Sequence, residues 1–215
     1  MLILALDGAL GPLTAALLDD DSGEAWLEAA APRDALEDGL RAVDHVLRAA
    51  GRHLREVERL AVTVGPGGFT GLRIALTFAK SLAFALDVPL IGISSYDALT
   101  PMSLAVPSLV AVRGRAGAAC VRLRLEGGEE RRCDEVDALA AWVQARVGSR
   151  KLSAAGALDE LAPALQRAGV SFRKVQDATE PAVRAARLAG IAVPSVGVHG
   201  VQPDYGERPH TTVPR

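Results

Sequence analysis

The sequence predicts an α/β protein composed of two consecutive lobes. The chain has 215 residues, 49% of them hydrophobic, so it is long and apolar enough for two small cores. The order strand-strand-strand-helix-strand-helix is expected in the first half and again in the second. This duplicated order is typical of two tandem ribonuclease-H-like lobes in an actin-like architecture. We therefore expect a first lobe over residues 1–105, a smaller second lobe over residues 106–200 and an extended tail over residues 201–215.

The strands of the first lobe are predicted from apolar or β-branched runs separated by turn residues. The run 2–6 is continuously apolar, and Gly8, Gly11 and Pro12 mark the turn that follows it. Three short strands with tight turns form a meander, and two further strands alternate with helices. The five expected strands are 2–6, 14–18, 25–28, 60–64 and 89–94.

Two helices are predicted in the first lobe. The first begins near Asp34, with Glu37 three residues later as in a capping box, and Gly51 stands where a left-handed C-cap belongs. The second covers residues 70–86. Apolar residues at spacings of four, three and four line one face of the first helix: Leu36, Leu40, Val43 and Leu47.

The second lobe is expected to follow a crossover between the lobes, because Pro101 and Pro107 interrupt regular structure there. Its expected strands are 109–112, 118–125, 129–133, 152–155 and 171–175, and its expected helices are 135–146, 158–168 and 181–189.

A glycine-rich segment before helix 70–86 is the most informative stretch of the chain. Its four glycines allow positive φ angles and close approach to another surface. Thr70 can cap the helix, and helix N-termini often hold phosphate. No Lys-Ser or Lys-Thr pair closes the segment, so it is not a Walker loop, and a phosphate-binding loop and a ligand-free tight turn both remain open. The segment consists of Gly65, Pro66, Gly67, Gly68, Phe69, Thr70 and Gly71.

Helix 70–86 is apolar over most of its circumference. Arg73 and Lys80 are its only charged residues, and they share one narrow stripe. A surface helix needs only one apolar stripe, so this helix is expected to pack on more than one side. Two arrangements are open: an interface that helices 34–50 and 70–86 form with a partner chain, or an internal sandwich between the sheet and the neighbouring helix.

The residues expected at the cleft between the lobes argue against a self-sufficient phosphotransferase. An actin-type ATPase uses an acidic residue from each lobe to hold Mg²⁺. Asp7, at the end of the first strand, can supply one and is a possible nucleotide contact. Arg113 stands where the second carboxylate belongs, and a cation cannot hold magnesium.

Histidines and cysteines show no metal-ligand spacing. His45 and His53 are eight residues apart, and His45 is expected on the solvent side of its helix. Cys120 and Cys133 are expected to be a reduced pair. We expect no metal site and no catalytic residue.

Charge and hydropathy indicate a cytoplasmic protein. The net charge of −2 provides no global basic field for nucleic acid, and the arginine pairs of the second lobe are expected on a solvated strand edge. The N-terminus lacks the basic start of a signal peptide, and no run is expected to reach the roughly 20 apolar residues of a membrane span.

Two segments resemble the bacterial TsaB family: Gly-Pro-Gly-Gly-Phe-Thr-Gly-Leu-Arg at residues 65–73 and the stretch 83–95. The resemblance covers roughly residues 1–100 and extends faintly to 203–208. It implies a two-lobed actin-like fold and a non-catalytic scaffold subunit, needed for threonylcarbamoyl transfer to adenosine 37 of tRNAs.

The resemblance also implies partners. The first two helices would pair with the catalytic paralogue TsaD, or form a homodimer in its absence, and the ATPase TsaE would join the complex. ATP and magnesium would belong to those subunits, and tRNA would be reached only through the complex. The implied partner-binding residues are Leu36, Leu40, Val43, Leu47, Leu72, Arg73, Leu76, Phe78 and Leu82.

Several positions depart from the family pattern. The first strand ends Asp7-Gly8-Ala9 instead of Asp-Thr-Ser, and the second lobe opens Arg113-Gly114-Arg115 instead of Asp-Ala-Arg. These changes remove polar groups or reverse charge near the cleft. The alternative function is an actin-fold ATPase or kinase with its own nucleotide site, and a metallopeptidase is disfavoured because its ligands are missing.

Overall fold

The computed structural model describes residues 1–29, 37–194 and 197–206. Its first half contains β1 (Leu2–Asp7), β2 (Thr14–Asp19), β3 (Ala25–Ala29), α1 (Glu37–Ala49), η1 (Leu54–Glu56), β4 (Arg59–Gly65), α2 (Phe69–Leu86), β5 (Leu90–Ser94) and α3 (Ser95–Ala98). Its second half contains β6 (Ser108–Arg113), β7 (Ala118–Leu125), β8 (Gly128–Glu135), α4 (Val136–Val147), β9 (Leu152–Gly156), α5 (Leu161–Arg167), β10 (Phe172–Lys174), α6 (Pro181–Ile191) and η2 (Val198–Gly200).

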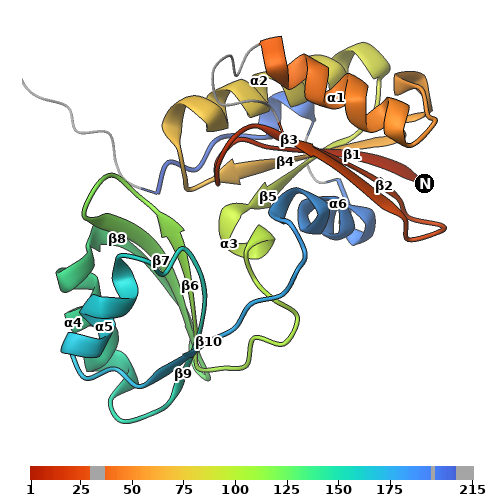
Figure 1. Ribbon diagram of the computed structural model, residues 1–215. Coiled ribbons are helices and arrows are strands. Elements are labelled where there is room, and N and C mark those ends of the chain that lie inside the picture. The colour runs from red at the N-terminus through yellow and green to blue at the C-terminus, as the bar shows by residue number, and fades with distance from the viewer. Residues whose placement is uncertain (30–36, 195–196, 207–215) are drawn as a thin grey trace, which may run out of the picture.

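These elements form two lobes, each built on a five-stranded sheet (Figure 1). The strand orders are β3-β2-β1-β4-β5 and β10-β9-β6-β7-β8. In both sheets an antiparallel meander lies on one side of the first strand, and parallel strands lie on the other. All ten predicted strands are present, and the predicted duplicated α/β architecture is confirmed.

Both faces of the first sheet are covered. Helices α1 and α2 lie side by side on one face (Figure 1), where Leu4 and Leu6 join their core. Helix α6 covers the other face, where Ile3 and Ala5 join a cluster with its alanines. The predicted placement of residues 181–189 in the second lobe was therefore wrong. The small side chains of α6 suit close packing on the first sheet: Ala182, Ala185, Ala186 and Ala189.

The second sheet is covered on one face by α4 and α5. Its opposite face meets the first lobe, because Tyr96 of α3 packs against Val110, Val112 and Cys120. Burial raises the pKa of the Tyr96 phenol far above its usual value, so this hydroxyl stays neutral. The short helix α3 thus packs between the two sheets.

Helix α2 corrects one expectation from the sequence. Its length and composition alone would allow it to cross a membrane, although no run of that kind was expected. In this fold the helix packs on the first sheet, and its other large apolar residues are at most partly buried against the same core. Its buried residues are Leu72, Ala75, Leu76, Ala79 and Ala83.

Helix ends follow the predictions in part. Gly51 has the predicted left-handed φ of 64° after α1, and the hydroxyl of Ser94 caps α3 by accepting a hydrogen bond from the Tyr96 amide. Thr70 is not a cap, because α2 begins one residue earlier with Gly68 as its N-cap. The predicted cap at Asp34 lies outside the described residues.

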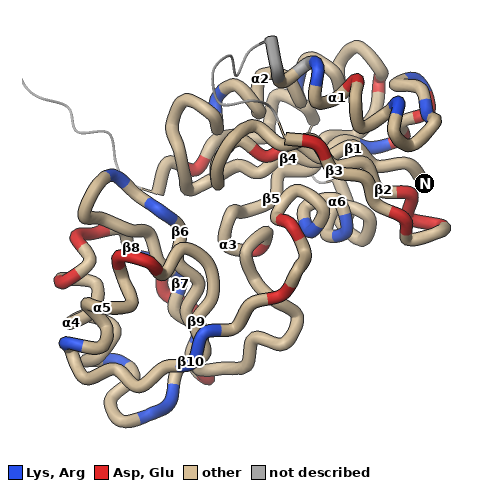
Figure 2. Tube along the Cα trace, viewed as in Figure 1, with Lys and Arg blue, Asp and Glu red and all other residues tan. Residues whose placement is uncertain are grey.

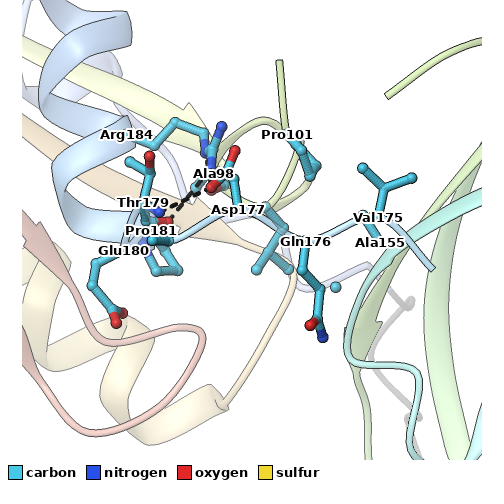
Figure 3. Close-up of a pocket in the computed structure, with 13 residues that line it drawn as sticks. Ala98, Pro101, Ala155, Val175, Gln176, Asp177, Thr179, Glu180, Pro181 and Arg184 are labelled. Carbon is cyan, nitrogen blue, oxygen red and sulfur yellow. Dashed lines mark hydrogen bonds and ion pairs between the residues drawn. The ribbon is translucent and has the colours of Figure 1, made fainter. Parts of the chain in front are cut away.

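One guanidinium ties together the two chain segments that cross between the lobes. Arg184 of α6 is 8% exposed. It donates to the carbonyls of Ala98 and Thr100 on the first crossing, at 3.0 and 2.7 Å, and to Oδ1 of Asp177 on the second, at 2.5 Å. Figure 3 shows Arg184, Ala98 and Asp177 along a pocket at the crossings, whose volume is about 300 Å³.

A second arginine joins the lobes directly. Arg122 of β7 is 1% exposed and donates to Asp97 at 2.5 Å and to the hydroxyl of Thr100 at 2.8 Å. Other arginines of this sheet pair with acids close by (Figure 2), so the arginine pairs do not form an open basic patch. Those pairs are Arg115–Glu135, Arg124–Glu129, Arg131–Glu129 and Arg132–Asp134.

We predict that Arg184→Lys will destabilise the protein by about 2–4 kcal/mol, because an ammonium cannot reach all the acceptors and leaves buried carbonyls unpaired. Arg187→Lys, on the exposed side of the same helix, is the control and should change stability by less than about 0.5 kcal/mol. Urea unfolding of both variants measures the difference. Equal stability of the two would show that the crossings are held by other contacts.

Candidate functional site

The glycine loop between β4 and α2 packs against the turn that follows β1. A Cβ on Gly67 would lie 2.1 Å from the carbonyl oxygen of Ala9, and the Gly68 amide donates to that same oxygen at 2.7 Å. A Cβ on Gly8 would lie 2.3 Å from the carbonyl oxygen of Gly71. The glycines therefore allow two backbone segments of the first lobe to touch, which supports the tight-turn alternative.

Asp7 does not face the space between the lobes. Its side chain is 4% exposed. Its Oδ1 atom accepts hydrogen bonds from the Thr63 hydroxyl and, at 3.0 Å, from the Ala9 amide. Burial raises the pKa of this carboxyl, and the hydrogen bonds oppose that shift. Asp7, the predicted nucleotide contact, is thus a buried residue that is hydrogen-bonded within the first lobe at the end of β1.

A cavity of about 510 Å³ lies between the lobes. Among the described residues that line it, Arg113 is the one charged residue, and this side chain is exposed and lies 3.4 Å from Asp159. A magnesium nucleotide held by carboxylates from both lobes does not fit these residues, because the first acid is buried and the second position is a cation. Among the described residues, no three His, Cys, Asp or Glu side chains gather as a metal site.

The predicted partner-binding residues whose side chains the structure describes fall into two groups. Val43, Leu47, Leu72 and Leu76 are at most 7% exposed and belong to the core of the first lobe. The prediction that these four residues contact a partner at the surface was wrong, because the apolar stripe of each helix faces its own sheet. Leu36 lies outside the described residues, as does the side chain of Leu40. Arg73 is exposed, and Phe78 and Leu82 are half-buried.

The outer face of α2, turned away from the sheet, carries a row of residues four apart: Arg73, Thr77, Ser81 and Ala85, all exposed. Half-buried Ile74, Phe78 and Leu82 border this row on one side. Phe84 borders it on the other and is 75% exposed. Phe84 was not among the predicted partner-binding residues. The hydrophobic pattern indicates which residues can be buried, but it does not indicate which face of the helix stays exposed in the folded lobe.

Helix α1 contacts α2 through a glycine. A Cβ on Gly39 would lie 2.2 Å from Cδ2 of Leu13 and 3.1 Å from Cε2 of Phe78, so the absence of a side chain leaves room for these two side chains. The exposed side of α1 is charged and includes Asp44, which pairs with Arg48 at 2.9 Å, and the predicted solvent-facing His45. The exposed apolar surface of this helix pair thus belongs mainly to α2.

The C-terminal tail reaches the start of α2. The amide of Asp204 donates to the carbonyl of Val64 at 2.6 Å. The centroid of the Tyr205 ring lies 5.2 Å from that of the Phe69 ring, and the guanidinium of Arg73 lies 5.1 Å from the centroid of the Phe69 ring. Residues 201–206 are therefore extended and packed on the first lobe.

Cys120 and Cys133 form a disulfide, so the expected reduced pair was wrong. They are direct neighbours in the antiparallel register of β7 and β8, with Cα atoms 4.0 Å apart. Their separation of thirteen residues reveals this pairing only once the hairpin turn at residues 126–127 is known.

Comparison with known proteins gives a consistent family. The family model described as TsaD, tRNA N6-adenosine threonylcarbamoyltransferase, matches residues 29–191. A tRNA threonylcarbamoyladenosine biosynthesis protein TsaB of Escherichia coli is 37% identical over 95 residues, and that of Bacillus subtilis is 33% identical over 99 residues. These matches cover 44% and 46% of this chain but only 41% and 43% of the relatives.

Solved structures show the same fold over a longer range. YeaZ from Pseudomonas aeruginosa superposes with a TM-score of 0.68 at 24% identity, covering 95% of this chain and 99% of that one. A Bacteroides thetaiotaomicron protein with an actin-like ATPase fold superposes with a TM-score of 0.53 at 9% identity, covering 86% and 94%. The two lobes thus have the actin-like arrangement.

We predict that Gly8→Ala will destabilise the protein by at least about 2 kcal/mol, because the new methyl group would collide with the backbone of Gly71. Gly11→Ala is the matched control in the same turn, where a Cβ meets nothing within 4 Å, and it should be neutral within about 0.5 kcal/mol. Thermal and urea unfolding compare the two. Similar losses would mean that the contact is easily relieved.

We further predict that Asp7→Asn will gain stability relative to the parent protein as pH rises from about 3.5 to 7. The pKa of Asp7 is higher in the folded state, so its contribution to the free energy of unfolding falls as pH rises from the unfolded to the folded pKa. Asparagine keeps an acceptor for Thr63 and Ala9 but does not ionise.

Unfolding free energies of Asp7→Asn and of exposed Glu126→Gln, measured at several pH values, check this prediction. The stability difference between the Asp7 variant and the parent should change with pH in the stated direction, and that of the control should not. A variant that becomes relatively weaker towards pH 7 would indicate that the ionised carboxylate is favourable in the fold.

Proposed function

Because this chain belongs to the family described by the TsaD model, that of tRNA N6-adenosine threonylcarbamoyltransferase, we propose that it acts in threonylcarbamoyladenosine biosynthesis as a non-catalytic scaffold subunit. The similarity of 95–99 residues of this chain to TsaB proteins supports the accessory role. In this proposal the protein is needed for threonylcarbamoyl transfer to adenosine 37 of tRNAs. It binds and stabilises a catalytic relative and works in the cytoplasm.

The outer face of α2 is the observation that carries the proposal. Phe84 is three-quarters exposed beside the small residues Thr77, Ser81 and Ala85. A row of small residues between larger apolar ones forms a groove, which suits the ridge of another helix. A large exposed aromatic side chain next to such a groove is typical of a protein interface.

The proposed partner is a TsaD-type protein that presents helices of its own to α1 and α2. In its absence, the same face would pair two copies of this chain. An ATPase of the TsaE type would join the complex, and tRNA would contact the assembled complex.

The cleft supports the non-catalytic part of the proposal. Asp7 is buried against Thr63, and Arg113 takes the place of a second acid. ATP and magnesium would therefore be held by the partner subunits. The alternative function, that of an actin-fold ATPase, requires this cleft to bind a magnesium nucleotide without a partner.

We predict that Ser81→Glu and Phe84→Glu will each weaken binding of the TsaD-type partner at least tenfold, because a buried unpaired carboxylate costs about 1.4 kcal/mol or more. Both residues are exposed, so thermal unfolding should change little. Arg187→Glu on α6 is the control and should leave binding unchanged. Calorimetry and size-exclusion chromatography give the measurements.

The same variants can be introduced into a strain that lacks the gene, with tRNA nucleosides analysed by mass spectrometry. The parent chain should restore threonylcarbamoyladenosine, and the two interface variants should restore less. Normal modification in the deletion strain, or turnover of Mg-ATP by the isolated chain, would contradict the proposal.

A further inference from the structure

The disulfide and Pro66 of the glycine loop both lie close to one residue of the tail, Gly206. A Cβ placed on Gly206 would be 2.8 Å from Sγ of Cys133, 3.0 Å from Sγ of Cys120 and 3.0 Å from Cβ of Pro66. Gly206 also has a φ of +71°, which L side chains rarely adopt. Gly206 therefore fits beside the two bonded sulfur atoms only because it has no side chain.

The residues before Gly206 contact the end of β4 and the start of α2. The Gly206 amide donates to the Asp204 side chain at 2.8 Å, and the Asp204 amide is bound to the end of β4. Tyr205, between them, stacks on Phe69, and Arg73 lies over the same ring. Arg73 is the first residue of the exposed row on the outer face of α2. An unbroken set of contacts thus joins the disulfide to that face.

We propose that the Cys120–Cys133 disulfide regulates the outer face of α2 through the tail, so that the oxidised protein presents Tyr205, Phe69 and Arg73 in one fixed arrangement and the reduced protein does not. The effect on partner binding rests on the proposed function. The effect on the tail stands without it.

The redox step balances with a dithiol as reductant. Cys133 lies on the edge strand β8 and is partly exposed, whereas Cys120 is 5% exposed. A thiolate of the dithiol attacks Sγ of Cys133, and Cys120 leaves as a thiolate that takes up a proton. The second thiol of the reductant then displaces Cys133. Two electrons and two protons pass to the protein, and the dithiol becomes a disulfide.

Reduction changes the space available to the tail. The two sulfur atoms separate from bonding distance to van der Waals contact, which is roughly 3.5–4 Å. Only about 3 Å separates the Cβ position of Gly206 from both sulfur atoms, so we expect the tail to shift when the sulfur atoms move apart. Disulfides in cytosolic proteins are commonly transient or redox-sensing, which agrees with such a role.

Hydrogen–deuterium exchange of the isolated protein provides the first test. Exchange in residues 201–206 and 66–73 should be at least tenfold faster after treatment with dithiothreitol, while residues 139–147 of α4 should not change. The double variant Cys120→Ser/Cys133→Ser should show the same exchange rates as the reduced protein, and dithiothreitol should not change them. Gly206→Ala should show the same loosening with the disulfide intact. Equal exchange in the oxidised and reduced proteins would overturn the proposal.

Partner affinity provides the second test. Reduction, the double serine variant and Tyr205→Ala should each weaken binding of the TsaD-type partner at least threefold, and Tyr205→Ala should add nothing in the reduced protein. Equal affinity in both redox states would overturn regulation of the face. No binding in either state, with the exchange difference present, would instead contradict the proposed function and support the movement of the tail.

Discussion

Both faces of the first sheet are apolar and must be covered by helices, and this requirement determines the path of the chain. Strand β1 is buried along its whole length, so apolar side chains on either side require a helix layer. The first half of the chain supplies α1 and α2 for one face only. The second face is covered by α6, which the chain reaches only after building the second lobe. The second lobe is therefore an insertion, and two crossings between the lobes are unavoidable.

Those crossings explain where the buried charge lies. Arg184 comes from the returning helix, and its guanidinium meets both crossings at one point. Arg122 approaches the same region from the second sheet. Five donors in a planar fork suit several backbone and carboxylate acceptors at once. The lobes are thus held together at the side of the cleft, which leaves the cavity itself without an acid from either lobe in its lining as described.

Sequence patterns predicted the strands well, because apolar runs between turn residues depend on local chemistry. They failed wherever the answer depended on long-range packing. The alanines of α6 are equally suited to either lobe until the sheet faces are known. Asp7 was read as a cleft residue because it ends a strand, yet Thr63 on the neighbouring strand binds it inside the lobe. Cys120 and Cys133 become neighbours only through the register of a hairpin.

The composition of α2 fits the two roles that we propose for this helix, in the core of the lobe and in partner binding. The sheet-facing side must be apolar to fold the lobe, and Leu72 and Ala79 are fully buried there. An outer side used only for solvent would be charged, as it is on α1. Instead it combines small residues with an exposed phenylalanine, which raises the hydropathy to the level of a membrane span. Exposed small residues beside an exposed phenylalanine, on a helix that already packs on its own sheet, fit the proposed second protein surface, and the tail that packs on Phe69 lies at one end of that surface.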